Sequence, residues 1–231
     1  VAFVLPMILS AQRSPFNGLD VLPADSTGHY RILIGGHFHG ESTNTSGYPA
    51  STLLANLDTI NSLGADLFLS TGDLFMDPVN DLPRYQRSLF SKLKMPFFNA
   101  PGNHDGHGGK ELERFALPAL LKIPGGLIGE ALDPRSSQVL MLDCEENDGS
   151  FSGQVLVELA SLSVDSVSGI DRIFIISHRP IWAEEDPQYS PLFADNTRST
   201  FGTNFQMDVY PLIEKIAQHA HVYWISGSMG G

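Results

Sequence analysis

The segment MPFFNAPGNHD (residues 95–105) gives the clearest indication of how this chain folds. Its first half is a short apolar run that predicts a buried β-strand. Glycine, asparagine, histidine and aspartate follow directly, where the strand is expected to end. A hydrophobic core does not require these polar residue types at a strand end, so the segment indicates a functional site built on a sheet.

The same arrangement recurs along the chain. Four other apolar runs end in polar or glycine-rich residues: YRILIGG (30–36), ADLFLSTGD (65–73), DRIFIISHRP (171–180) and HVYWISGS (221–228). One more strand is expected at 137–144, and helices at 49–64, around 81–93, from 110 up to Pro118, at 153–163 and at 209–220. Continuous apolar strands separated by helices predict an α/β fold with a mainly parallel sheet covered on both faces. In such folds the carboxyl ends of the strands carry the ligand site.

Composition excludes several classes of function. The chain has 231 residues, 42% of them hydrophobic and 17% charged, which is typical of a globular protein. Its formal net charge is -12 and its basic residues are scattered. We therefore expect no nucleic-acid partner. A single cysteine excludes an internal disulfide and a cysteine-rich metal site.

Residues 1–29 are expected to form an N-terminal segment, and residues 30–231 one domain. The first residues, VAFVLPMILSAQR, are apolar but too short to span a bilayer. Two interpretations stay open: the end of a signal or anchor segment, or an ordinary packing segment. The first interpretation favours export or membrane association through the N-terminus. The sequence makes no prediction of the oligomeric state.

The residue types at the strand ends suit metal-assisted hydrolysis. Imidazole nitrogens and carboxylate oxygens hold a divalent cation, which polarises an ester and lowers the pKa of water. His37 and His39 are two residues apart in GGHFHG (35–40). On an extended segment both side chains point the same way, so both are expected to face the site.

The order of these motifs resembles that of the calcineurin-like metallophosphoesterase family. The motifs are HFH (37–39), GDLFMD (72–77), GNHD (102–105), SHRP (177–180) and SGSMGG (226–231). The resemblance covers residues 30–231 and implies a layered α/β/β/α sandwich with mainly parallel central strands. It also implies hydrolysis of phosphate monoesters or diesters.

The resemblance assigns roles by position. Asp73 would bridge two metals, His37 and His39 would bind the first metal, and Asn103 and His178 would bind the second. His104 would contact the phosphate or protonate the leaving group. Asp105 would orient His104.

The chain departs from the family pattern at both ends. His37 stands where the family has aspartate, and Ser228 and Gly230 stand where it has two histidines. Each expected metal thus loses one ligand. We therefore expect one tightly held divalent ion, manganese, iron or zinc, and a second that is weak or absent. Because the chain stops at Gly231, directly after the last motif, either the sequence is a fragment or the fold is shortened.

Three functional hypotheses follow. The first is a metal-dependent hydrolase acting on a small-molecule, lipid or glycan phosphate ester. The second is a related scaffold that has lost catalysis and serves as a binding or assembly module. The third is an enzyme of different chemistry with one metal held by His37, His39 and Asp73.

Overall fold

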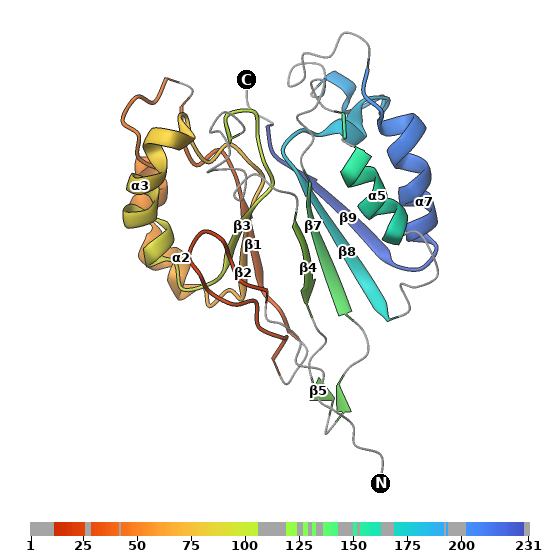
Figure 1. The fold of residues 1–231 in the computed structure, drawn as a ribbon, viewed down its shortest axis with the longest axis horizontal. Coiled ribbons are helices and arrows are strands. Elements are labelled where there is room, and N and C mark those ends of the chain that lie inside the picture. Colours follow the sequence, from red (N-terminus) through yellow and green to blue (C-terminus); the bar gives the residue numbers. More distant parts are fainter. Residues whose placement is uncertain are drawn as a thin grey trace.

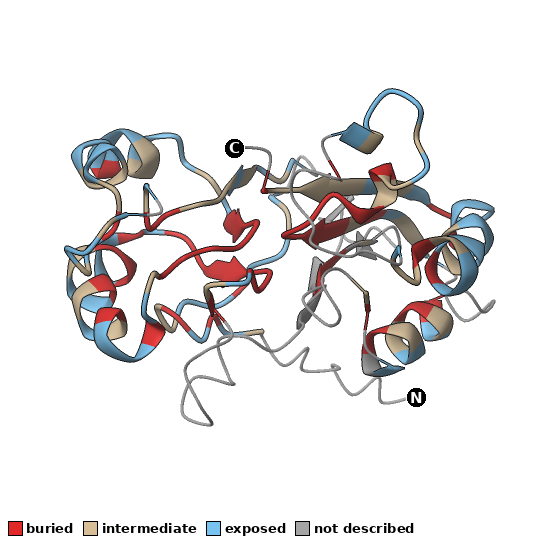
Figure 2. Ribbon diagram, turned by 90° about the horizontal axis from the view of Figure 1, so that it is seen from above, coloured by how far each residue is buried: buried red, intermediate tan, exposed pale blue. Residues whose placement is uncertain are grey.

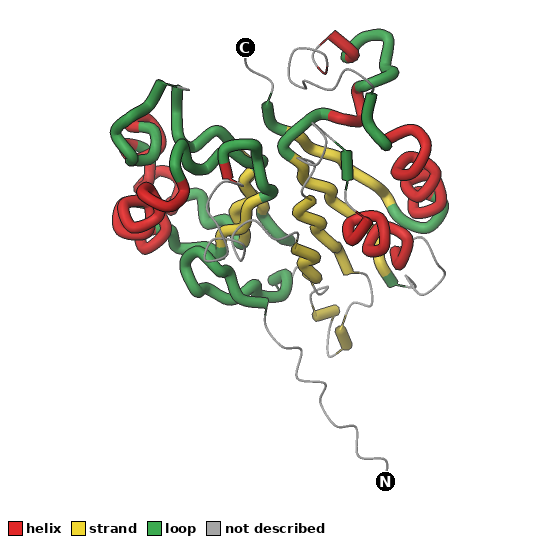
Figure 3. The backbone as a smooth tube through the Cα atoms, turned by 45° about the horizontal axis from the view of Figure 1, so that its top comes forward, coloured by secondary structure: helices red, strands yellow, loops and turns green. Residues whose placement is uncertain are grey.

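Two β-sheets lie face to face in the computed structural model of the protein, and helices cover the outer side of each (Figure 1). The structure describes residues 12–25, 29–41, 43–105, 119–123, 127–128, 131–132, 136–142, 150–151, 153–162, 169–191, 193 and 202–228. The backbone tube shows the same layering, with helices on the two flanks and strands between them (Figure 3).

The first sheet is entirely parallel. Its order is β1 (Ile32–Gly35), β2 (Leu67–Ser70) and β3 (Phe97–Asn99). The connections between these strands carry α1 (Ser51–Ala55), α2 (Leu57–Ser62), α3 (Pro78–Ser88) and a 3₁₀ turn at Phe90–Lys92. Parallel neighbours need such crossover connections, so the helices lie on the outer face of this sheet.

The second sheet has the order β4 (Ala119–Ile123), β7 (Ser136–Leu142), β8 (Ile170–Ser177) and β9 (His221–Ser226). β7, β8 and β9 are parallel, whereas β4 is antiparallel to β7. A short antiparallel pair is formed by β5 (Leu127–Ile128) and β6 (Ala131–Leu132). α5 (Gly153–Leu162) and α7 (Tyr210–Ala217) cover the outer face, with a π-helical turn at Phe205–Val209 and a 3₁₀ turn at Ile181–Ala183.

Buried apolar side chains of the described residues form separate groups between successive layers. Phe68 of β2 packs toward the first set of helices, whereas Leu67 and Leu69 pack toward the second sheet. In β7, Met141 belongs to the core between the sheets and Leu140 to the core under α5 and α7. This alternation follows from the two-residue period of a strand. Buried residues accordingly concentrate on the strands and the inner sides of helices (Figure 2). The predicted α/β/β/α sandwich with mainly parallel strands is confirmed.

The helix predicted at 49–64 is interrupted. α1 and α2 are separated at Asn56, whose backbone has φ -105° and ψ 9°. The Asn56 side chain donates a hydrogen bond to the carbonyl of Thr52 at 2.8 Å. Asparagine commonly competes with the backbone in this way, which explains the break.

The helix predicted around 81–93 begins earlier, at Pro78. The carboxylate of Asp77 accepts a hydrogen bond from the backbone N–H of Asn80 and caps the helix. Proline directly after a capping aspartate is a favourable start for a helix, so the signal was present in the sequence.

The remaining predicted elements correspond to β7, α5 and α7 with its π-helical turn. The helix expected from 110 to Pro118 lies outside the described residues. Sequence analysis did not predict β4, which immediately follows that segment.

Part of the N-terminal segment packs against the domain. The Ser14 hydroxyl donates to the carbonyl of Phe97 at 2.6 Å, and the Asn17 amide donates to that of Met95 at 2.8 Å. Phe16 is buried beneath the first sheet's helices. Residues 12–21 therefore pack against the domain, whereas residues 1–11, which make up most of the apolar run with two open interpretations, lie outside the described residues. No helix within the described residues is long and apolar enough to cross a membrane.

Candidate metal centre

The predicted site residues follow the carboxyl ends of strands in both sheets. In the first sheet Gly35, Ser70 and Asn99 lie in register at the ends of β1, β2 and β3. In the second sheet Ser177 and Ser226 pair at the ends of β8 and β9. Parallel strands thus deliver the polar loops of each sheet to one edge.

A contact between the two sheets joins these edges. Nδ1 of His178, directly after β8, lies 2.8 Å from the carbonyl oxygen of Thr71, directly after β2. A carbonyl only accepts, so Nδ1 donates its proton. In the neutral ring Nε2 then carries the lone pair, and it lies 3.3 Å from Oδ2 of Asp73. His178 is fully buried. Its tautomer and orientation are therefore set by the backbone.

Glycines permit this close approach. Gly72 has φ +98°, and a Cβ there would lie 2.6 Å from Nδ1 of His178 and 2.9 Å from the carbonyl oxygen of Ala100. At Gly102, a Cβ would lie 2.6 Å from the backbone nitrogen of Asp73. Real Cβ atoms essentially never approach other heavy atoms so closely, which accounts for both glycines of these motifs.

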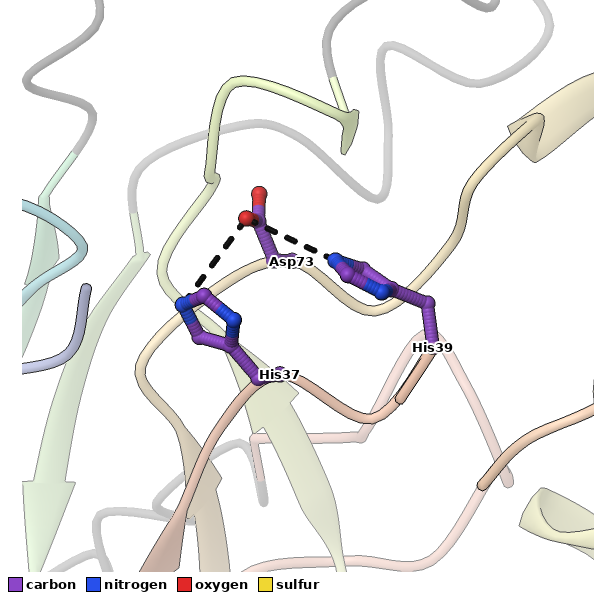
Figure 4. Close-up of side chains that lie close together, drawn as sticks. All are labelled: His37, His39 and Asp73. Atoms are coloured by element: carbon purple, nitrogen blue, oxygen red, sulfur yellow. Dashed lines mark ion pairs between the residues drawn. The ribbon is translucent and has the colours of Figure 1, made fainter. Parts of the chain in front are cut away.

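Three imidazoles from two loops converge on one carboxylate oxygen. Oδ2 of Asp73 lies 3.6 Å from Nε2 of His39 and 3.9 Å from Nε2 of His37, in addition to the His178 contact. His37 and His39 both point toward Asp73 (Figure 4). The potential ligand atoms of these three residues, His37, His39 and Asp73, all lie within 4.8 Å of one another.

His37 reaches the site by a different route from the one predicted. β1 ends at Gly35, and His37 has φ +54°, so the two histidines do not lie on an extended strand. The backbone N–H of Gly40 donates to the carbonyl of His37 at 3.0 Å and closes a turn. Asp73 also has a positive φ, of +56°. Left-handed backbone at residues other than glycine costs about 1–3 kcal/mol each and concentrates at functional sites.

Asp73 is 3% exposed and is held as a carboxylate. Burial alone would raise its pKa, but the adjacent imidazoles of His178 and His39 outweigh burial and lower the pKa well below the usual range. The backbone N–H of His104 also donates to Oδ1 at 3.2 Å. For His37, burial lowers the pKa more than the Asp73 charge raises it. A neutral imidazole is the form that binds metal.

His104 lies beside this cluster. Its ring centroid is 5.0 Å from that of His39, and its side chain is partly exposed. The imidazole therefore lies where it can reach both the cluster and solvent.

Asp105 was predicted to orient the His104 ring, but its carboxylate contacts other groups. It is buried, and among the described residues it accepts hydrogen bonds from the backbone N–H groups of Asp73, Leu74, Phe75 and Gly102 and from the side-chain amide of Asn99. Burial raises its pKa, against the effect of the hydrogen bonds from Gly102 and Asn99. None of these donors is the His104 ring. Asp105 ties the loop after β2 to the loop after β3.

The Asn103 side chain contacts an arginine in the second sheet. Asn103 is exposed, and its Oδ1 accepts a hydrogen bond from Nη2 of Arg179 at 3.5 Å. Ser228, where the family has histidine, is 9% exposed. Gly230 lies outside the described residues. The structure thus gathers His37, His39, Asp73 and His178, whereas Asn103 pairs with an arginine.

Sequence analysis did not single out Arg179 or the serine that positions it. The Ser177 hydroxyl donates to the Arg179 carbonyl at 3.0 Å and accepts from Nε1 of Trp224 at 2.9 Å. It also lies 3.0 Å from the Ser226 hydroxyl. The sequence did offer a signal for these serines, because Ser177 and Ser226 each end an otherwise apolar strand.

The cluster has the properties of a metal site. Nε2 of His37 and Nε2 of His39 are buried and have no hydrogen-bond partner among the described residues. A buried polar atom left in that state costs about 1–3 kcal/mol. A divalent cation would engage both lone pairs together with the carboxylate of Asp73. Imidazole nitrogens and a carboxylate oxygen suit zinc, manganese and iron. The residues present therefore fit a metal.

Comparison with known proteins agrees with this geometry. The family model of calcineurin-like phosphoesterases matches residues 30–223, which is most of the chain. A search of curated proteins found no match. The matched range contains β1, β2, β3 and β8 with the histidine cluster that follows their ends, and it stops within β9. The chain belongs to the calcineurin-like phosphoesterase family.

Proposed function

We propose that the protein is a hydrolase of phosphate esters that depends on one tightly held divalent ion. The supporting observation is the convergence of His37, His39 and His178 on Oδ2 of Asp73, at 3.9, 3.6 and 3.3 Å. His37, His39 and Asp73 would hold the ion, and His178 would complete the set. When bound, such an ion polarises a phosphoryl oxygen and makes a nearby water more acidic.

The chain's own residues would orient the site and move protons. Asp73 remains ionised at neutral pH because its pKa is lowered. Thr71 holds the His178 ring in the tautomer whose Nε2 faces Asp73. His104, which is partly exposed beside His39, would donate a proton to the leaving oxygen. Its backbone N–H holds Asp73, so the proton donor and the carboxylate are fixed together.

The contacts of Asn103 support a single ion. Its amide oxygen, the ligand expected for a second metal, is exposed and accepts from Arg179. A neutral amide is already a poor ligand, and Ser228 stands where a histidine would contribute. Asp73 also brings only one negative charge. A second divalent ion would therefore be weakly held.

Elemental analysis of protein purified without chelator tests this proposal. It is combined with turnover of p-nitrophenyl phosphate and bis-p-nitrophenyl phosphate, with and without added Mn²⁺. We expect about one equivalent of metal, and metal-dependent turnover. His39→Ala should weaken metal binding by more than about 100-fold, since loss of even a supporting residue costs 10- to 100-fold.

His221→Ala is the matched control, because this histidine is exposed at the start of β9, at the opposite end of the strand from the site. It should retain both metal and turnover. A wild-type protein with no bound metal and no turnover under any supplement would contradict the proposal.

A non-catalytic binding module is the second candidate. The observation in its favour is that the Asn103 amide is engaged by Arg179 while Ser228 replaces a histidine. Metal binding without turnover of either ester would support this candidate over the hydrolase.

A further inference from the structure

Arg179 places a positive charge next to the residue expected to bind a second metal. Its Nη2 lies 3.5 Å from Oδ1 of Asn103, and the residue is only 8% exposed. Arginine remains charged at any physiological pH, and its planar fork matches phosphate oxygens. The buried Arg179 therefore lies directly after β8, and its guanidinium contacts the loop that follows β3, beside the histidine cluster.

The backbone on either side of the guanidinium is fixed. The Ser177 hydroxyl bonds the Arg179 carbonyl, and the His178 ring bonds the Thr71 carbonyl across the two sheets. These contacts fix the backbone from which the Arg179 side chain extends, and Asn103 holds its guanidinium end. A charge positioned in this way costs no reorganisation when an anion binds.

A phosphate ester in the site requires positive charge on more than one side. In the family pattern a second cation supplies it, but here the ligands for that cation are reduced. We propose that Arg179 replaces the second cation and binds the phosphoryl oxygens of the substrate, with Asn103 holding the guanidinium in place. This inference rests on the proposed function, because it requires a phosphate ester at the metal cluster.

Isothermal titration with inorganic phosphate tests the inference, using the protein as purified with its metal. Removing a charge-assisted hydrogen bond costs roughly 1.5–3 kcal/mol, so Arg179→Gln should bind phosphate about 10- to 100-fold more weakly. Its metal content should stay at that of the wild type. Arg172→Gln is the matched control, because Arg172 pairs with Asp171 on the half-exposed start of β8. It should bind phosphate as the wild type does.

Asn103→Asp provides a second test that does not depend on altering a buried residue. The new carboxylate would pair with the guanidinium and compete with phosphate for it. Phosphate binding should fall by a similar factor, while the exposed position keeps the melting temperature close to that of the wild type. Arg179→Lys, which retains the charge but not the fork, should give an intermediate affinity.

The outcomes separate this inference from the proposed function. Loss of phosphate affinity in Arg179→Gln but not in Arg172→Gln supports the inference, even where neither ester is turned over. Phosphate affinity in Arg179→Gln within about twofold of the wild type would overturn it, even in an active hydrolase. No measurable phosphate binding by the wild type, or two equivalents of tightly bound metal, would also overturn it.

Discussion

Replacing Asp105 with asparagine tests whether this carboxylate holds the site loops together. In the wild type both oxygens accept hydrogen bonds: Oδ1 from Leu74 and Phe75, and Oδ2 from Asp73, Gly102 and Asn99. Asparagine keeps one oxygen and replaces the other with an NH₂ group. Whichever way the amide is oriented, at least two buried backbone N–H groups lose their acceptor and face a donor.

The size of the effect follows from that count. Each buried donor left without an acceptor costs about 1–3 kcal/mol, so Asp105→Asn should destabilise the protein by about 2–6 kcal/mol. In a domain of this size each kcal/mol lowers the melting temperature by about 2–4 °C, which predicts a fall of roughly 5–20 °C. Differential scanning calorimetry measures it. Asp58→Asn, at an exposed position in the first turn of α2, is the control and should cost less than about 1 kcal/mol.

Normal stability combined with lost turnover in Asp105→Asn would refute the assignment of this carboxylate to the loops. If Asp105→Asn melts within about 2 °C of the wild type but loses turnover, the carboxylate acts on His104, as its position in the motif suggests, and its hydrogen bonds to the loops contribute little.

Three further substitutions test other parts of the site. Gly102→Ala would place a Cβ 2.6 Å from the backbone nitrogen of Asp73. It should cost about 1–3 kcal/mol and weaken metal binding in a titration, whereas Gly153→Ala, where a Cβ meets nothing within 4 Å, should be close to neutral. Ser177→Ala removes the hydroxyl of a fully buried residue that bonds the Arg179 carbonyl and the Trp224 indole, and should lower the free energy of unfolding by roughly 1–3 kcal/mol in urea titrations. Asp77→Ala removes the cap of α3 and should lower the melting temperature at neutral pH. Hydrogen bonds from the side chain and backbone of the capped turn lower the pKa of Asp77, so its contribution is present above pH 4 and is lost as the pH falls through the folded-state pKa. Melting curves of the two proteins should therefore converge in acid, and a difference that persists unchanged at low pH would contradict the assignment of the cap.

Strands β2 and β3 of the first sheet were predictable because they are buried on both faces. All four residues of β2, Leu67–Ser70, are buried, so the strand reads as a continuous apolar run. The break between α1 and α2 was not predictable from periodicity. The pattern reports which face of a helix is apolar, whereas the break depends on Asn56 bonding the carbonyl of Thr52. β4 was missed because its sequence continues a helical pattern that is interrupted only by Pro118.

The site was predictable to the extent that parallel strand ends meet at one edge. This rule correctly predicted that His37, His39, Asp73 and His178 lie close together. It could not show which partner each polar side chain takes, because that depends on the path of the loops. The turn at His37 and the loop contacts of Asp105 are examples, and so is the Asn103 pair with Arg179. The positive φ at His37 is a local property that nothing in the pattern HFH indicates.

Anomalous diffraction from crystals grown with Mn²⁺ tests the central claim most directly. We expect one strong anomalous peak, about 2.0–2.3 Å from Nε2 of His37, Nε2 of His39 and a carboxylate oxygen of Asp73. We expect no peak of comparable height between Asn103 and His178. Two equal peaks bridged by Asp73, or a single peak bound by Asn103, would contradict the one-ion site, and the absence of any peak at the cluster would contradict metal binding there.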